Sequence, residues 1–217
     1  MVDRASVTEL YVNNKNLKAL DLNKYVNLAW LYCYNNQLVE LGVSKCVKLE
    51  QLYCSGNQLK ELDVSKCVNL NELSCGGNQL KELDVSKCVK LVYLNCSDNQ
   101  LKELDVSKCM NLVMLYCGGN DIRKLDIRGL RKLQRVYIKE SPFLAELLAG
   151  EEQKTEIRLR EGEWVGVREA QTMLESGRAI QKRFQWWATG AQYRPGGSGY
   201  VNSLESFEKR IKTGFKK

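Results

Sequence analysis

Apolar and polar positions recur along the first two thirds of the chain with a period of 21 residues. The copies follow one another without insertion or deletion and begin at Leu10, Leu31, Leu52, Leu73, Leu94, Leu115 and Val136. Their shared pattern is L-x-C-x-x-N-x-L-x-x-L-D-V-S-K-C-x-x-L-x-x. One copy cannot bury its apolar positions alone, so the period predicts coils that stack into a continuous core.

The L-x-C segment of each copy alternates between core and outward positions, which predicts a short strand in every coil. Strands of successive coils are expected to pair in parallel. A polar column follows the strand, and an inward asparagine there can hydrogen-bond the backbone of neighbouring coils. This structural column consists of Asn36, Asn57, Asn78, Asn99 and Asn120.

The string Leu49-x-x-Leu52-x-Cys54-x-x-Asn57 resembles the leucine-rich repeat LxxLxLxxN, with cysteine in place of the third leucine. The resemblance covers about residues 7–140, six full coils and a partial seventh. It implies a right-handed, curved solenoid with a parallel sheet on its concave face and short irregular, 3-10 or extended segments on the convex face. The short repeat and its L-D-V-S-K continuation look like bacterial members, whose strand face usually binds proteins.

Residues 141–217 are predicted to form a separate α+β capping or accessory region after a solenoid at 1–140, and they resemble no recognised family. After Ser141 and Pro142 the period is expected to end. The stretch FLAELLAGEEQ is predicted to be a helix that covers the open end of the solenoid, as repeat arrays require. A strand is expected at Thr155–Arg160 and a helix at Val167–Ser176, ending at Gly177.

The nine cysteines fall into two columns of the repeat and predict core positions rather than chemistry. The strand column holds five of them, and Val12 and Ile138 occupy the same column in the end coils, as a small apolar core position would allow. A ladder of thiols does not converge on a tetrahedral metal site. Neither a metal nor a cofactor is expected. Unpaired thiols in this number fit a reducing, cytoplasmic compartment, although delivery into a host cell as an effector stays open.

The outward positions of the strands, which we call the strand face, are rich in residue types typical of interfaces. The candidate partner-binding residues are Tyr11, Trp30, Tyr32, Tyr34, Tyr53, Tyr93, Met114, Tyr116, Arg135 and Tyr137. Ser74 and Asn95 interrupt the tyrosine column at its centre. An alternative explanation is that exposed strands favour aromatic residues, and that tyrosine stacks on tyrosine for stability.

Elsewhere in the repeat the surface is nearly invariant. The Lys-Glu pairs of successive coils and the Asp and Lys residues of D-V-S-K predict a solvated outer surface laced with salt bridges. The positions that vary between coils therefore lie on the strand face, which favours that face as the source of specificity.

The net charge of +7 resides in residues 178–217, which hold nine basic and two acidic residues. Basic and aromatic residues interleave there, and the possible patch for an anionic partner is Arg178, Lys182, Arg183, Trp186, Trp187, Arg194, Lys209, Arg210 and Lys212. Single-stranded nucleic acid, an acidic protein or an anionic membrane could bind such a segment. The alternative is a small cap domain whose aromatic residues form its core.

The absence of histidine removes the commonest general base, and no catalytic motif is present. No apolar run is long enough to cross a membrane, and no signal peptide is visible. The leading hypothesis is a non-enzymatic protein-protein interaction module that uses the strand face. Two alternatives are a targeting arm for a C-terminal effector region and a self-associating structural protein.

Overall fold

The structure, a computed structural model, describes residues 4–141, 143–150, 153–160 and 163–176. The chain divides into two compact units, Met1–Ala170 and Gln171–Lys217. The described part of the second unit is limited to residues 171–176. The basic patch predicted between Arg178 and Lys212 therefore lies outside the described residues. The functional division of the chain at residue 140 stays a prediction.

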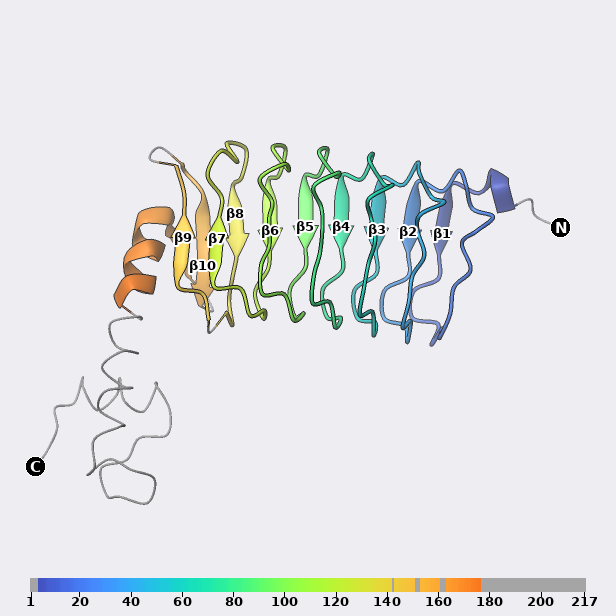
Figure 1. Ribbon diagram of the computed structural model, residues 1–217, viewed down its shortest axis with the longest axis horizontal. Coiled ribbons are helices and arrows are strands. Elements are labelled where there is room, and N and C mark those ends of the chain that lie inside the picture. Colours follow the sequence, from blue (N-terminus) through green and yellow to red (C-terminus); the bar gives the residue numbers. More distant parts are fainter. Residues whose placement is uncertain (1–3, 142, 151–152, 161–162, 177–217) are drawn as a thin grey trace, which may run out of the picture. The chain divides into compact units, whose positions relative to one another are not determined.

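The first unit is a solenoid in which successive coils add one strand each to a single sheet (Figure 1). A short 3-10 turn, η1 (Arg4–Ser6), precedes the first coil. The parallel strands are β1 (Glu9–Tyr11), β2 (Trp30–Tyr32), β3 (Gln51–Tyr53), β4 (Glu72–Ser74), β5 (Tyr93–Asn95), β6 (Met114–Tyr116), β8 (Arg135–Tyr137) and β10 (Glu156–Arg160). Paired residues lie one repeat apart, as Leu31 with Leu52 does. The predicted parallel solenoid is confirmed.

The core runs through the coils as columns of identical residues. In the coil of β3, Leu52, Cys54, Leu59 and Leu70 are fully buried. The first coil has a neighbour on one side only, and its Leu10 is correspondingly half-buried. Stacking of the coils therefore buries the apolar set that each coil could not bury alone.

A turn that contains one residue with positive φ, in the left-handed region, follows each of the strands β1 to β6 and β8. The residue with positive φ recurs with the repeat, at Asn14, Asn35, Gly56, Gly77, Asp98, Gly119 and Glu140. Glycine, asparagine and aspartate tolerate this region better than other residues do, which explains their recurrence directly before the asparagine column. Glu140 at φ 59° departs from that preference in the last of these turns.

The coil series does not end at residue 141, and in this respect the sequence-based prediction was wrong. Ile157 of β10 pairs with Val136 of β8, again one repeat apart. The predicted strand at Thr155–Arg160 is thus an eighth strand of the same sheet. A hairpin partner, β11 (Glu163–Gly166), then pairs antiparallel with β10 at the edge of the sheet.

The helix predicted for FLAELLAGEEQ is also wrong. Residues Glu146–Leu148 of that stretch form strand β9, which pairs in parallel with β7 (Lys124–Asp126) in a separate two-stranded sheet. Leu144 and Leu147 are buried while Phe143 is 52% exposed. Leucines three residues apart suit a helical stripe, but they also suit a short strand flanked by turns. The predicted helix at 167–176 is confirmed, with Val167 and Ala170 buried.

Candidate functional site

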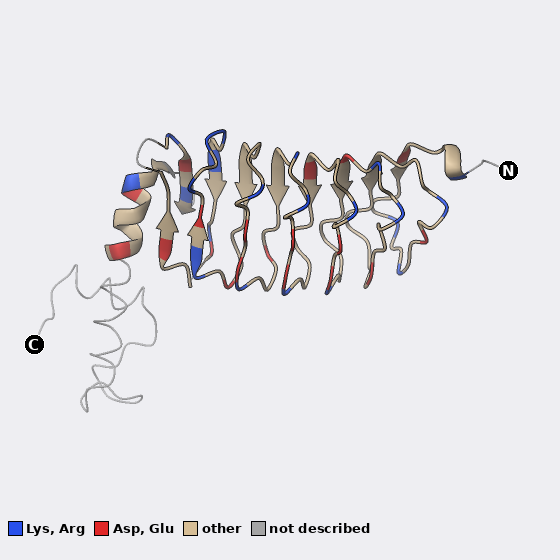
Figure 2. Cartoon of the chain, turned by 45° about the horizontal axis from the view of Figure 1, so that its top comes forward, with Lys and Arg blue, Asp and Glu red and all other residues tan. Residues whose placement is uncertain are grey.

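The strand face carries few charged side chains along most of its length. Between β1 and β6 the strands are mostly tan in Figure 2, and charged residues gather on the connecting segments. Glu9 and Glu72 are the charged residues within these six strands. The candidate partner-binding residues of the sequence analysis lie on the strands of this face, except Tyr34, which follows β2 after Cys33. Most of them are half-buried.

Tyrosines of the strand face form two separate ring stacks. At the N-terminal end, Tyr32 stacks between Tyr11 and Tyr53, with ring centroids 4.9 Å and 4.8 Å away. At the other end, Tyr116 and Tyr137 stack with centroids 5.4 Å apart. The parallel register places one ring of each coil above the next, which produces these stacks.

Side chains beside the stacks extend these aromatic surfaces. The Tyr93 ring tilts toward Tyr116 with centroids 5.6 Å apart, and the Arg158 guanidinium lies 5.1 Å from the centre of the Tyr137 ring. Within the described residues neither Trp30 nor Tyr34 joins a ring stack. The strand face therefore brings most, but not all, of the predicted aromatic residues into contact.

A hydrogen-bond network ties the N-terminal stack to the neighbouring column of side chains. The Tyr32 hydroxyl donates to Oε1 of Gln51 at 2.6 Å, and Gln51 Nε2 donates to Oε1 of Glu72 at 3.4 Å. The Tyr53 hydroxyl donates to Oε2 of Glu72. Tyr11 makes the equivalent bond to Glu9 within its own strand, at 2.9 Å.

The phenols of this network resist ionisation. Partial burial, followed by the hydrogen bond to Glu72, raises the pKa of Tyr53, and burial together with the charge of Glu72 raises the pKa of Tyr32. At Tyr11 the bond to Glu9 is the largest cause of a raised pKa. These hydroxyls therefore keep their protons and their hydrogen bonds at neutral pH.

Short side chains separate the two stacks. Ser74 takes the tyrosine position in β4 and is 7% exposed, and its hydroxyl lies 2.8 Å from that of Ser55. Asn95 takes the same position in β5, where its Oδ1 accepts from the Ser97 N–H at 3.1 Å. Gly76 and Gly118 follow β4 and β6 in the adjacent column. The tyrosine column of the strand face thus lacks bulky side chains in β4 and β5, where it separates the two stacks.

Sequence reasoning did not identify the polar partners at this site. Gln51 and Glu72 precede the tyrosine positions in β3 and β4, so their column is visible in the repeat. Their bonds to phenols of adjacent coils depend on side-chain conformations that the repeat pattern does not define. Arg158 was missed because the coil series was expected to end before β10.

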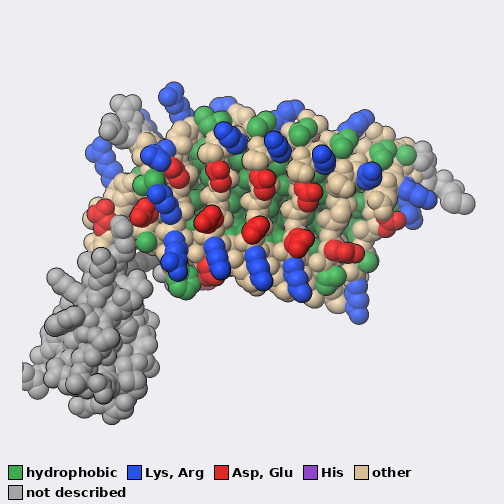
Figure 3. Space-filling view, viewed as in Figure 1, with side chains coloured by type: hydrophobic (Ala, Val, Ile, Leu, Met, Phe, Trp, Pro, Cys, Tyr) green, Lys and Arg blue, Asp and Glu red, His purple; other side chains and the backbone are tan. Residues whose placement is uncertain are grey.

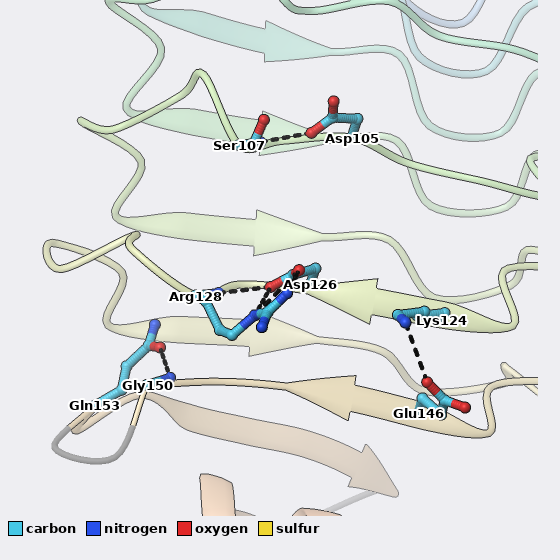
Figure 4. Close-up of polar contacts among 8 residues, drawn as sticks. All are labelled: Asp105, Ser107, Lys124, Asp126, Arg128, Glu146, Gly150 and Gln153. Carbon is cyan, nitrogen blue, oxygen red and sulfur yellow. Dashed lines mark hydrogen bonds and ion pairs between the residues drawn. The ribbon is translucent and has the colours of Figure 1, made fainter.

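The opposite surface carries the invariant charged residues in parallel rows, as Figure 3 shows. Within the described residues the Lys-Glu pairs such as Lys81 and Glu82 form no ion pair, so the salt bridges predicted for those coils are absent. Aspartates bond the backbone instead: Asp105 Oδ1 accepts from the Ser107 N–H at 2.8 Å (Figure 4). The pair Lys124 and Glu146, 3.4 Å apart, bridges β7 and β9.

All nine cysteines are buried and unpaired. Burial raises the pKa of the Cys33, Cys75 and Cys117 thiols to about 12, so the thiolate form that would act as a nucleophile or metal ligand is disfavoured. Within the described part of the chain no group of three His, Cys, Asp or Glu side chains is arranged to hold a metal ion. The same residues contain no helix long and apolar enough to cross a membrane.

Residues 68–109 match a family model described as leucine-rich repeats in two copies. The solenoid is a leucine-rich-repeat array. No curated protein matches the chain. Leucine-rich repeats form a family of protein-interaction scaffolds, and enzymes are untypical of it.

Several solved structures share the leucine-rich-repeat fold. An internalin from Listeria monocytogenes is 20% identical with a TM-score of 0.59, and the match covers 68% of this chain and 44% of that one. The repeat domain of APL1B is 17% identical with a TM-score of 0.61, covering 70% and 50%. A leucine-rich-repeat protein of Leptospira interrogans is 24% identical with a TM-score of 0.52, covering 63% and 40%. This chain therefore spans half or less of the length of these proteins.

Proposed function

We propose that this chain is a non-enzymatic binding protein whose strand face engages another protein. The observation that supports it is the pair of tyrosine stacks on the face that varies between coils. Tyrosine supplies a large contact area at a small cost in side-chain entropy, and its hydroxyl can still bond a partner. The invariant surface opposite offers solvated charges that contribute little to affinity.

Stability alone is the competing explanation for the tyrosine column, because stacked rings support the sheet whether or not a partner binds. Two features favour binding over that explanation. Trp30 and Tyr34 are exposed in part without joining a stack, and Met114 lies beside Tyr116 on the same face. A purely structural ladder has no need for apolar groups in the columns beside it.

The test compares capture of proteins from a native lysate by three forms of the immobilised chain. Alanine at Tyr32, Tyr53 and Tyr116 should abolish capture of the specific partner. Alanine at Glu61, Glu82 and Glu103, on the invariant surface, should leave capture unchanged. A partner retained equally by both triple variants would overturn the proposal.

The triple tyrosine variant must keep its fold, because loss of capture by an unfolded chain would not report on binding. Circular dichroism and the urea midpoint measure that directly. If alanine destabilises the chain, serine at Tyr32 and Tyr53 provides a second variant, since β4 already carries serine in this column as Ser74.

We also propose a reducing compartment for this protein. Nine buried thiols without a disulfide support that placement, because oxidising compartments favour disulfide formation. Labelling of free thiols after rapid acid quenching of intact cells should find all nine reduced.

A further inference from the structure

We infer that the partner segment that binds the N-terminal half of the strand face is cationic. One arginine or lysine side chain of this partner contacts Glu72. The inference rests on the proposed function and adds the chemistry of the partner. It follows from which hydrogen-bond donors of this half of the face are engaged within the protein and which acceptors are left for a partner.

Every phenolic hydrogen of the N-terminal stack is donated within the protein. The acceptors are Glu9 for Tyr11, Gln51 for Tyr32 and Glu72 for Tyr53. What the phenols still offer a partner is the lone pairs of their oxygens, beside two carboxylates. This half of the face therefore presents acceptors and selects a partner that brings donors.

Both faces of the central ring of the stack are covered as well. Tyr32 has Tyr11 on one side and Tyr53 on the other, with interplanar angles of 12° and 8°. Its outward contact is therefore limited to the ring edge and the hydroxyl oxygen. An aromatic side chain of a partner cannot stack on Tyr32, whereas a positively charged donor can approach the oxygens along the row.

Glu72 is the position where such a donor gains most. Its carboxylate accepts from Tyr53 and Gln51, and an ionised carboxylate has about four acceptor positions, so further bonds are available. Ser74 and Gly76 follow it with short side chains. A guanidinium can add a charge-assisted bond there, and those bonds are stronger than neutral ones.

The other end of the strand face has the opposite charge character. Arg135, Lys139 and Arg158 lie on or directly after β8 and within β10. Glu156 pairs with Arg135 at 3.3 Å and Glu140 pairs with Lys139 at 3.0 Å, and this leaves the group of five side chains with one net positive charge. A cationic partner group is repelled from this end, which confines it to the half that contains Glu72.

The experiment measures binding of a fluorescently labelled arginine hexapeptide to the full chain at low salt. Wild type should bind the peptide, and Glu72→Gln should weaken binding roughly tenfold, the loss expected for one charge-assisted hydrogen bond. Gln51 already occupies the same column in β3, so the fold tolerates glutamine at this position. Glu82→Gln makes the same chemical change on the opposite surface and should alter affinity less than twofold.

Three outcomes would overturn the inference. The first is an equal loss of affinity for the arginine peptide in Glu72→Gln and Glu82→Gln, and the second is no loss of affinity in Glu72→Gln. The third is a glutamate hexapeptide that binds as tightly as the arginine peptide and whose binding is lost in Glu72→Gln. Lysate capture separates this inference from the proposed function. A partner that is lost with the triple tyrosine variant but bound equally by Glu72→Gln would leave the proposed function intact and remove the cationic anchor.

Discussion

Asn57 bonds Cys33 across the boundary between two coils: its Nδ2 donates to the Cys33 carbonyl oxygen at 3.1 Å. The same nitrogen donates to the Cys54 carbonyl oxygen of its own coil at 2.9 Å. Its Oδ1 accepts from the Leu38 N–H at 3.0 Å. One buried side chain thus satisfies backbone groups of two coils, and Asn78 and Asn99 repeat the arrangement.

Asn57→Ala should lower the free energy of unfolding by about 1–3 kcal/mol, because it leaves buried donors and acceptors of both coils unsatisfied. Urea unfolding followed by circular dichroism measures the loss. Gln58→Ala is the matched control, since this neighbouring side chain is exposed. Equal shifts in the two midpoints would show that the cross-coil bonds contribute nothing specific.

The tyrosine stack should contribute to stability as well as to binding. A double-mutant cycle of Tyr32→Leu and Tyr53→Leu should give a coupling energy of about 0.5–1.5 kcal/mol, the range for aromatic pairs. The cycle of Tyr53→Leu and Tyr116→Leu is the control, because these rings belong to different stacks on β3 and β6. Its coupling should be close to zero, and equal couplings in the two cycles would contradict a contribution from the ring contact.

The repeat period alone predicts most of the fold. L-x-C alternation places β1 through β6 and β8 correctly, since every coil repeats the same burial pattern. It fails at FLAELLAGEEQ, where Leu144 and Leu147 have a spacing that suits both a helix and a short strand. Only the pairing of β9 with β7 decides between the two, and that contact is not encoded in local periodicity.

The sequence predicts which residues of the candidate site face outward but not the hydrogen bonds between them. Column positions give the outward direction of Tyr32 and Tyr53. The bonds from these phenols to Gln51 and Glu72 depend on side-chain torsions and on distances between coils. The donor and acceptor character of the face therefore emerged from the structure.

The aspartates of the D-V-S-K segments should make stability depend on acid pH. The backbone and side-chain hydrogen bonds of Ser86 lower the pKa of Asp84. A lowered folded-state pKa adds stability above the ordinary value near 3.8, and that stability is lost as pH falls through the folded-state pKa. Asp84→Asn keeps the acceptor oxygen, so its urea midpoint should fall less than that of wild type between pH 5 and pH 2. An identical acid profile would contradict this, and Glu82→Gln, an exposed carboxylate of the same coil, serves as the control.

The cysteine columns should make stability depend on alkaline pH. Here the stabilisation is lost as pH rises, whereas that of the aspartates is lost as pH falls. Burial raises the pKa of Cys75 from 9.0 to about 12. The unfolded state therefore releases the proton first, and the stabilisation present below pH 9 is lost as pH rises toward 12.

Cys75→Val should reduce this alkaline loss, by on the order of 1 kcal/mol per pH unit above 9. Valine suits the position, because Val12 occupies the same column in the first coil. Urea midpoints at pH 7 and pH 10 measure the change, with Ser65→Ala on the outer surface as the control. In parallel, a thiol reagent at pH 8 should react slowly with the native chain and with all nine cysteines after unfolding. Rapid reaction of the native protein would show that the ladder is accessible and would contradict its role as core.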